Sequence, residues 1–216
     1  MNGPPSMDGP GAATGHASLL VLRGLRCAGA AGLHRLHLVT GLDEADVESE
    51  LIDLGRAGLA RRLPGGLPGT GWQLTGAGKD SDAERTAGEL ESAGARPAVT
   101  AAFERFLVLN PELLDLCTAW QLRPVDGMLS ANDHRDPAYD ARVLAGFVEL
   151  DRRASGVCAE LTAALPRFGR YRTRLAGALD RAAAGELAYV TDDTASYHTV
   201  WAELHEDLLT TLGRER

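Results

Sequence analysis

The chain of 216 residues has few aromatic side chains, few cysteines and an excess of negative charge. Aromatic residues make up 5% of it, and Cys27, Cys117 and Cys158 are widely spaced without a Cys-x-x-Cys pair. This pattern predicts reduced core thiols in a cytoplasmic protein rather than a disulfide framework. The 22 basic residues are outnumbered by 30 acidic ones, and the formal charge is −8. A strongly basic DNA-binding protein would look different, so any binding to nucleic acid requires a local patch.

Sequence signals for membranes, export and catalysis are also missing. No run of 18 apolar residues occurs, and the N-terminus has no charged region followed by an apolar one, so we expect neither a transmembrane segment nor a signal peptide. There is no Walker loop, nucleophile elbow or dinucleotide fingerprint. The Gly-rich residues 64–71 precede an expected strand rather than a helix, so they are not a phosphate loop. We expect no enzyme activity and no cofactor.

Composition divides the chain into a tail and two parts. Residues 1–16 are rich in Gly and Pro and hold no apolar run, so we expect a disordered tail. Residues 17–80 contain seven basic and seven acidic residues, whereas residues 81–216 contain 15 and 22. Ala, Leu and Arg dominate, which favours helices. We predict a mainly α-helical protein with a small β-structure, divided into one domain at 17–80 and an all-helical domain at 81–216.

Residues 32–78 carry the most informative pattern. A helix that ends at Gly41 is followed at once by another helix with Asp43 as its N-cap. Apolar residues recur at helical spacing and form the buried faces of the two helices: Leu33, Leu36 and Val39, then Val47, Leu51 and Leu54. Residues 59–63 and 72–74 are short strands around a turn rich in Gly and Pro.

This order of helix, turn, helix, strand, turn and strand resembles the winged helix-turn-helix of the MarR-like bacterial transcription regulators. The residues that carry the resemblance are Ala57-Gly58-Leu59-Ala60-Arg61-Arg62 at the start of the wing and Trp72-Gln73-Leu74-Thr75 with Gly78 at its end. The resemblance covers residues 18–79, about a third of the chain. It implies an N-terminal winged helix-turn-helix that binds duplex DNA, and a homodimer on a pseudo-palindromic operator. Residues 81–216 are about twice as long as the dimerisation helices of that family, so its dimer and ligand crevice do not carry over.

The second helix of this motif is acidic, with no basic residue between Asp43 and Arg56. A carboxylate-rich helix is repelled by DNA, which carries about one negative charge per 1.7 Å of duplex axis. Acidic residues in its first turn are favoured by the helix dipole in any case. We mark as candidate DNA contacts two residues on the outward face of this helix and the basic residues around it: Ser49, Arg56, Arg35, Arg61, Arg62 and Lys79.

The C-terminal part predicts about six helices and no strand. Asn110-Pro111 and Asp136-Pro137 each resemble an N-cap followed by proline at the first helical position. A loop is expected at residues 123–133, and the helix that starts after Asp136 is expected to end at Arg153, before a short helix at 157–165. Trp120 and Trp201 both lie on apolar stripes, which predicts that they share one core.

Two clusters of polar residues in this part suggest binding sites. Arg167, Arg170, Arg172 and Arg174 form the densest positive patch, and we mark them as candidate ligands of a small anionic effector. The alternative is a helix face that pairs with the abundant Asp and Glu. His198 and His205 lie seven residues apart, about 10 Å along a helix, which is unsuitable for a single metal ion. We therefore predict no metal site.

Three functional hypotheses follow. The first is a DNA-binding transcription regulator with a helical domain for dimerisation or for sensing a small anionic effector. The second is a protein that does not bind DNA, either a winged-helix module that docks a protein through its acidic helix or a sensor of an anionic ligand. The third, an enzyme in the helical half, would require a buried cluster of carboxylates or of His134, His198 and His205.

Overall fold

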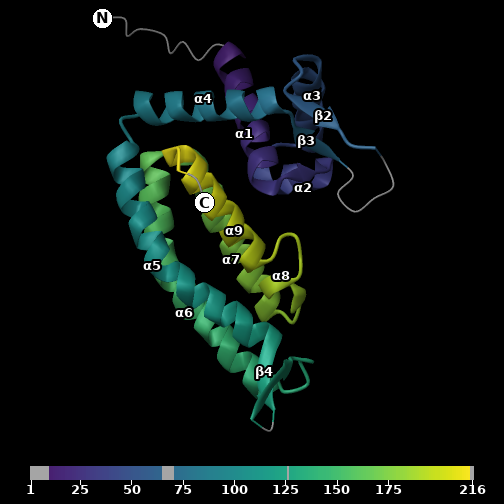
Figure 1. Ribbon diagram of the computed structural model, residues 1–216, viewed down its shortest axis with the longest axis vertical. Helices are drawn as coiled ribbons and strands as arrows, with labels where there is room; N and C mark the ends of the chain where they lie inside the picture. The colour runs from purple at the N-terminus through teal and green to yellow at the C-terminus, as the bar shows by residue number, and fades with distance from the viewer. Residues whose placement is uncertain (1–9, 65–70, 126, 215–216) are drawn as a thin grey trace, which may run out of the picture. The chain divides into compact units, whose positions relative to one another are not determined.

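The computed structural model describes residues 10–64, 71–125 and 127–214, and it is mainly helical (Figure 1). The chain forms two compact units: the first comprises residues up to Glu89 together with Gly213 and Arg214, and the second comprises Leu90–Leu212. The boundary lies inside a helix, nine residues beyond the change in composition at residue 80. Among the described residues, no helix combines the length and the apolar composition needed to cross a membrane.

The first unit contains four helices and a three-stranded antiparallel sheet in its described part. The elements are α1 (Pro10–Ala28), β1 (Ala30–Ala31), α2 (Leu33–Thr40), α3 (Glu44–Arg56), β2 (Ala60–Arg62), β3 (Trp72–Leu74) and α4 (Gly76–Ser92). The strand order is β1-β3-β2, so β3 is central. Helix α1 packs against both α2 and α3, and the core of the unit lies between these helices and the sheet.

The two helices predicted on either side of the turn at Gly41 lie where the sequence places them. Gly41 ends α2 in the left-handed conformation, with φ of 76°, and Asp43 occupies the N-cap position of α3. The side chain of Asp43 makes no capping hydrogen bond. Asp43 therefore contributes to the start of α3 only through its extended backbone conformation. Five of the six apolar residues predicted to face inward are buried, and the sixth, Leu33, packs against the same core.

The sheet contains one strand that the sequence did not reveal. The strand β1 has two residues, too few to show an alternation of apolar and polar side chains. Ala31 pairs with Trp72, and a Cβ atom at the adjacent Gly71 would lie only 2.4 Å from the Ala31 carbonyl oxygen. Glycine is therefore required where these two chains approach each other. Residues 65–69 of the predicted turn between β2 and β3 lie outside the described residues.

The expectation of a disordered tail at residues 1–16 needs a correction. Helix α1 begins at Pro10, within that segment, and residues 1–9 lie outside the described residues. Proline is well tolerated in the first turn of a helix, and the alanines that follow have the highest helix propensity. α1 therefore extends towards the N-terminus beyond the first apolar residue on which the prediction relied, although Gly11 and Gly15 have low helix propensity.

A buried ion pair joins α1 to α4. Arg23 and Asp82 are both fully buried and their side chains lie 3.1 Å apart, and the Arg23 guanidinium also donates to the hydroxyl of Thr86. The sequence places Arg23 among the apolar residues of α1 but gives no sign of its partner 59 positions later. Because both charges are removed from water, this pair constrains how α4 lies on α1.

The second unit is a bundle of long helices. Its elements are α5 (Arg96–Gln121), β4 (Leu122–Val125), β5 (Met128–Ala131), α6 (Pro137–Ala164), η1 (Pro166–Phe168), α7 (Gly169–Ala183), α8 (Ala188–Thr191) and α9 (Tyr197–Leu212). Helix α5 packs along α6, α6 packs along α7, and α9 lies against both α5 and α7. The capping prediction at Asp136 is confirmed, since its carboxylate accepts hydrogen bonds from the backbone of Ala138 and Tyr139.

Two predicted breaks between helices are wrong. Asn110-Pro111 lies inside α5, and α6 continues through the expected gap after Arg153. The Asn110 side chain accepts a hydrogen bond from Trp201 Nε1 at 3.0 Å instead of capping a helix. In α5, Leu109 and Leu113 are buried on either side of the proline. Packing along the bundle therefore outweighs the backbone hydrogen bond lost at Pro111.

The loop predicted at residues 123–133 is largely a β-hairpin, so the prediction of no strand in the C-terminal part is also wrong. β4 pairs with β5 in antiparallel register, with Val125 opposite Met128. Asp126-Gly127 is the dipeptide that favours a two-residue hairpin turn, and Gly127 has φ of 82°. Most side chains of the two strands are exposed, so the alternation that signals a strand is absent.

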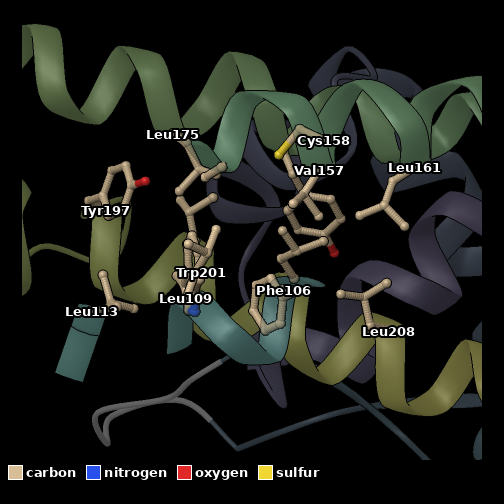
Figure 2. Close-up of a cluster of buried hydrophobic side chains, with 14 of the residues drawn as sticks. Phe106, Leu109, Leu113, Val157, Cys158, Leu161, Leu175, Tyr197, Trp201 and Leu208 are labelled. Atoms are coloured by element: carbon tan, nitrogen blue, oxygen red, sulfur yellow. The ribbon is translucent and has the colours of Figure 1, made fainter. Parts of the chain in front are cut away.

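The core of the second unit is continuous, and it confirms that Trp120 and Trp201 belong together. Figure 2 shows side chains that meet in this core, among them Phe106 from α5, Leu161 from α6, Leu175 from α7 and Trp201 from α9. The rings of Phe106 and Trp201 stack with centroids 4.5 Å apart. This bundle thus has its own hydrophobic core, separate from that of the first unit.

Candidate functional site

The six residues predicted to contact DNA all lie in the first unit, on four different elements. Ser49 and Arg56 are exposed on α3, Arg61 and Arg62 are exposed on β2, Arg35 is half-buried on α2, and Lys79 is exposed in the first turn of α4. The buried face of α3 is occupied by its three apolar residues, so Ser49 and Arg56 are left on the solvent side. The structure thus keeps the predicted outward face of α3 accessible.

The basic side chains of this surface differ in how they are engaged. Arg56 donates to Asp53, one turn earlier on α3, at 3.0 Å, and both groups are well exposed. Arg61 faces the side-chain amide of Gln73 on β3, with the amide oxygen oriented to accept. The side chains of Arg62 and Lys79 make no hydrogen bond or ion pair with any described residue. Two cations on this surface therefore remain available to an external anion.

The start of α4 is fixed to the start of β2 by Thr75. Its hydroxyl donates to the Gly58 carbonyl oxygen at 2.7 Å, lies 3.1 Å from that of Leu59, and accepts from the backbone N–H of Gly78. A Cβ atom at Gly78 would lie 1.9 Å from the Leu59 carbonyl oxygen, so only glycine fits there. The Thr75 and Gly78 pattern in the sequence therefore has a physical cause, which is the close contact between these two backbone segments.

Negative charge is concentrated along α3. Burial raises the pKa of the Glu50 carboxyl group above its ordinary value, and the neighbouring carboxylates of Asp53 and Asp46 raise it further, while Arg85 opposes them. Glu44 is engaged with His34 at 3.0 Å. The carboxylates expected from the sequence therefore lie close together on α3. The surface that α3 forms with the neighbouring basic residues carries both signs of charge.

The four arginines predicted to hold an anionic effector are all in ion pairs within the second unit. Arg167 and Arg170 both donate to the fully buried Asp207, which also accepts from Tyr171. Arg172 makes a two-pronged contact with Asp151, at 2.6 and 2.7 Å, and Arg174 pairs with Glu203 at 2.6 Å. A ligand at this cluster would have to compete with these carboxylates.

The carboxylate partners were not identified from the sequence. Glu203 and Asp207 lie four residues apart on α9 among its apolar residues, and Asp151 lies on α6. One signal in the sequence could have indicated these ion pairs: a carboxylate on the apolar side of a predicted helix. Such a group is seldom buried without a partner. Its partner, some 40 residues away along the chain, could not be read from local spacing.

The histidines and cysteines do not form a reactive centre in the described part of the chain. His134 contacts Asp140 at 3.1 Å, whereas the ring of His205 lies against Phe106. No group of three or more potential ligands able to hold a metal ion occurs among the described residues. Burial raises the pKa of Cys117 to about 12 and that of Cys158 to about 11, as expected of core thiols. These two thiols are therefore protonated at neutral pH and poor nucleophiles.

Comparison with known proteins adds no relative to this description. No family model matches the chain, and neither a curated protein nor a solved structure shows significant similarity to it.

Proposed function

We propose that the first unit is a winged helix-turn-helix that binds duplex DNA, and that the protein is a transcription regulator. Support comes from the element order, in which α2 and α3 follow α1 and β1 and precede the pair β2 and β3, with β3 central in the sheet. This is the arrangement that the resemblance to MarR-like regulators implies. α3 would be the helix that approaches the major groove, and β2 and β3 would form the wing.

The observation that carries the proposal is the accessible positive charge beside α3. Arg61 and Arg62 are adjacent and exposed on β2, and the guanidinium of Arg62 has no partner among the described residues. Phosphate contacts supply most of the affinity of sequence-independent DNA binding. We therefore assign the DNA affinity chiefly to the wing, because the acidic residues of α3 oppose the approach of a polyanion.

The second unit would provide dimerisation or sensing. Exposed aliphatic side chains occur on its two longest helices: Leu107, Val108 and Leu114 on α5, and Val148 on α6. Such residues on a long helical surface support a homodimer, which would place two winged helices on the half-sites of one operator. Light scattering should then give the mass of two chains, and a monomer at micromolar concentration would contradict this part of the proposal.

The test of DNA binding is the double variant Arg61→Ala/Arg62→Ala. It should weaken binding to all duplexes and lower the salt dependence by up to about two phosphate equivalents. The measurement is a fluorescence titration of mixed-sequence duplex DNA, and of the DNA upstream of the protein's own gene, at two salt concentrations. Arg142→Ala/Arg152→Ala on α6 removes the same charge from exposed positions of the second unit and serves as the control. Unchanged binding in the wing variant would contradict the assignment.

A second candidate function is a winged-helix module that docks a protein and does not bind DNA. The crowded carboxylates of α3 favour it, because a cationic partner would relieve the repulsion that contributes to the raised pKa of Glu50. The same titration separates the two functions: a wild type without affinity for any duplex at low salt would favour the docking module.

A further inference from the structure

A cavity of about 750 Å³ lies between α2, α3 and the pair of strands β2 and β3. Its volume falls within the range of small-molecule binding sites. Its wall is about equally polar and apolar, and the apolar part includes Leu33, Ile52, Leu63 and Trp72. Ile52 has 41% of its surface exposed, so an apolar side chain of α3 stands open to this space instead of packing into the core.

Two charged groups of opposite sign complete the wall, Glu48 on α3 and Arg62 on β2. Their side chains form no ion pair with each other, and neither makes a hydrogen bond to another described residue. On α3, Glu48 lies four residues before Ile52, so the carboxylate and an apolar wall residue belong to one helix face. The cavity therefore offers an anion, a cation and an apolar surface together, and neither charge has a partner among the described residues.

The position of Trp72 gives the cavity a rigid side. Trp72 lies on β3, opposite Arg62 on β2, and its ring packs so closely on α3 that a Cβ atom at Gly55 would lie 3.0 Å from it. The glycine at position 55 therefore allows the indole to lie against the helix. The remaining border includes Gly32 and Leu33 at the N-terminus of α2, where the helix dipole favours a negative group.

These features disfavour several classes of ligand. The Glu48 carboxylate would repel a polyanion such as DNA, and the Arg62 guanidinium would repel a simple cation. A neutral apolar molecule would leave both charges without a partner. A molecule with an apolar body, one ammonium group and one carboxylate satisfies all three surfaces. We propose that this cavity binds a small hydrophobic zwitterion, a free hydrophobic amino acid or a short peptide, with its ammonium at Glu48 and its carboxylate at Arg62.

The proposal has a regulatory consequence, which rests on the proposed DNA-binding function. The cavity lies between α3 and the strands β2 and β3, which are the elements proposed to contact DNA, and it uses Arg62, one of the proposed phosphate contacts. Occupation by the ligand would therefore neutralise Arg62 and lower the affinity for duplex DNA.

The test uses the full chain and calorimetric titration with leucine, tryptophan and the dipeptide Leu-Trp. The dipeptide is also measured with its amine acetylated and, separately, with its carboxylate amidated. Wild-type protein should bind the unmodified zwitterion at one site and bind each blocked form about threefold to tenfold more weakly. Comparison of the amino acids with the dipeptide shows which length the cavity accepts. Absence of saturable binding by all of these probes at millimolar concentration would overturn the proposal.

Two variants assign the ends of the ligand. Glu48→Gln should abolish the preference for a free amine and keep the preference for a free carboxylate, and Arg62→Gln should do the reverse. Matched controls are Glu84→Gln on α4 and Arg56→Gln on α3, which remove the same charges at exposed positions that do not border the cavity. Loss of both preferences in a control variant, or retention of both in the two cavity variants, would overturn the assignment.

The DNA measurement is kept separate from the binding measurement. Saturating dipeptide should weaken DNA binding by the wild type, and in Glu48→Gln the same effect should require about threefold to tenfold more dipeptide. Binding of the dipeptide without any effect on DNA supports the site and overturns only its regulatory role. A protein that binds the dipeptide but no duplex at all would overturn the proposed function and leave the zwitterion site supported.

Discussion

At the residue scale, the first unit depends on a charged pair that is removed from solvent. Arg23 on α1 and Asp82 on α4 are both fully buried, and Thr86 adds a hydroxyl to the guanidinium. Replacing a buried pair by apolar residues is often harmless, but removing one member leaves an uncompensated charge. Removal of one member of the pair should therefore weaken the packing of α4 against α1.

We predict that Asp82→Ala destabilises the first unit by about 3–5 kcal/mol, because Arg23 is left buried without its partner carboxylate. Amide hydrogen exchange in α1 and α4 is the measurement, since it separates this unit from the helical bundle. Asp80→Ala, at an exposed position of the same helix, should change protection by less than about 0.5 kcal/mol. Equal effects of the two substitutions would contradict a special role for Asp82.

Glu50 provides a second prediction, based on pH. Burial and the carboxylates of Asp53 and Asp46 raise its pKa, so the ionised group is less favourable in the folded chain than in the unfolded chain. Glu50→Gln should therefore increase the free energy of unfolding at neutral pH. As the pH falls through the raised pKa and below the ordinary value for glutamate, about 4.3, Glu50 becomes protonated in both states and the advantage disappears.

The measurement for Glu50 is the difference in unfolding free energy between variant and wild type from pH 7 to pH 4, with Glu84→Gln as the exposed control. A difference that grew on acidification would show that the carboxylate is stabilised in the folded chain, which is the opposite of the predicted direction.

At the scale of elements, tertiary packing decides where the helices of the second unit end. α5 continues through Pro111, and the Asn110 side chain is bonded to the indole of Trp201 on α9. The same indole stacks on Phe106 of α5. A single side chain thus joins α9 to α5 both by apolar contact and by a hydrogen bond. Figure 2 shows Trp201 beside Phe106.

We predict that Trp201→Ala lowers the free energy of unfolding of the bundle by about 3–5 kcal/mol, since it creates a large cavity and leaves Asn110 without its donor. Thermal and urea unfolding measure the effect. Leu129→Ala on β5 removes an apolar side chain that is 69% exposed, and it should have an effect within about 0.5 kcal/mol. An unaltered melting temperature for Trp201→Ala would mean that this residue does not belong to the core.

At the scale of the whole molecule, the distribution of charge governs any encounter with DNA. The chain is acidic, yet residues 17–80 contain equal numbers of basic and acidic residues, and the excess of carboxylates lies in residues 81–216. Long-range attraction to a polyanion is therefore weak, and the DNA binding that we propose would depend on short-range contacts at the first unit.

We predict that Asp46→Asn/Asp53→Asn strengthens DNA binding about threefold or more at low salt, because two negative charges leave the exposed part of α3 and Arg56 loses its pairing partner. The gain should shrink at higher salt. Asp80→Asn/Glu84→Gln on α4 makes the same change in net charge and should have a smaller effect. If the substitutions on α3 leave DNA affinity unchanged but weaken binding to a protein partner, the docking module is the better description.

The sequence by itself determined much of the first unit. The α2 and α3 helices, their turn at Gly41, the N-cap at Asp43 and the paired strands β2 and β3 follow from apolar periodicity and glycine placement, which are local signals. The acidity of α3 and the candidate contacts Arg61 and Arg62 are visible for the same reason. The hairpin of β4 and β5 was also signalled locally by the Asp-Gly pair in the sequence between its strands, but the strands are exposed and show no apolar alternation.

The tertiary structure alone decided which distant groups meet. The partners of Arg23 and of Arg167 are 59 and 40 positions away, and the helix of Pro111 is continuous because packing on α6 and α9 outweighs a local break signal. Glu48, which had no role in the sequence pattern, acquires one only because the fold places it with Arg62 and Trp72 on one cavity. Such contacts depend on how elements pack rather than on spacing along the chain, so no local pattern contains them.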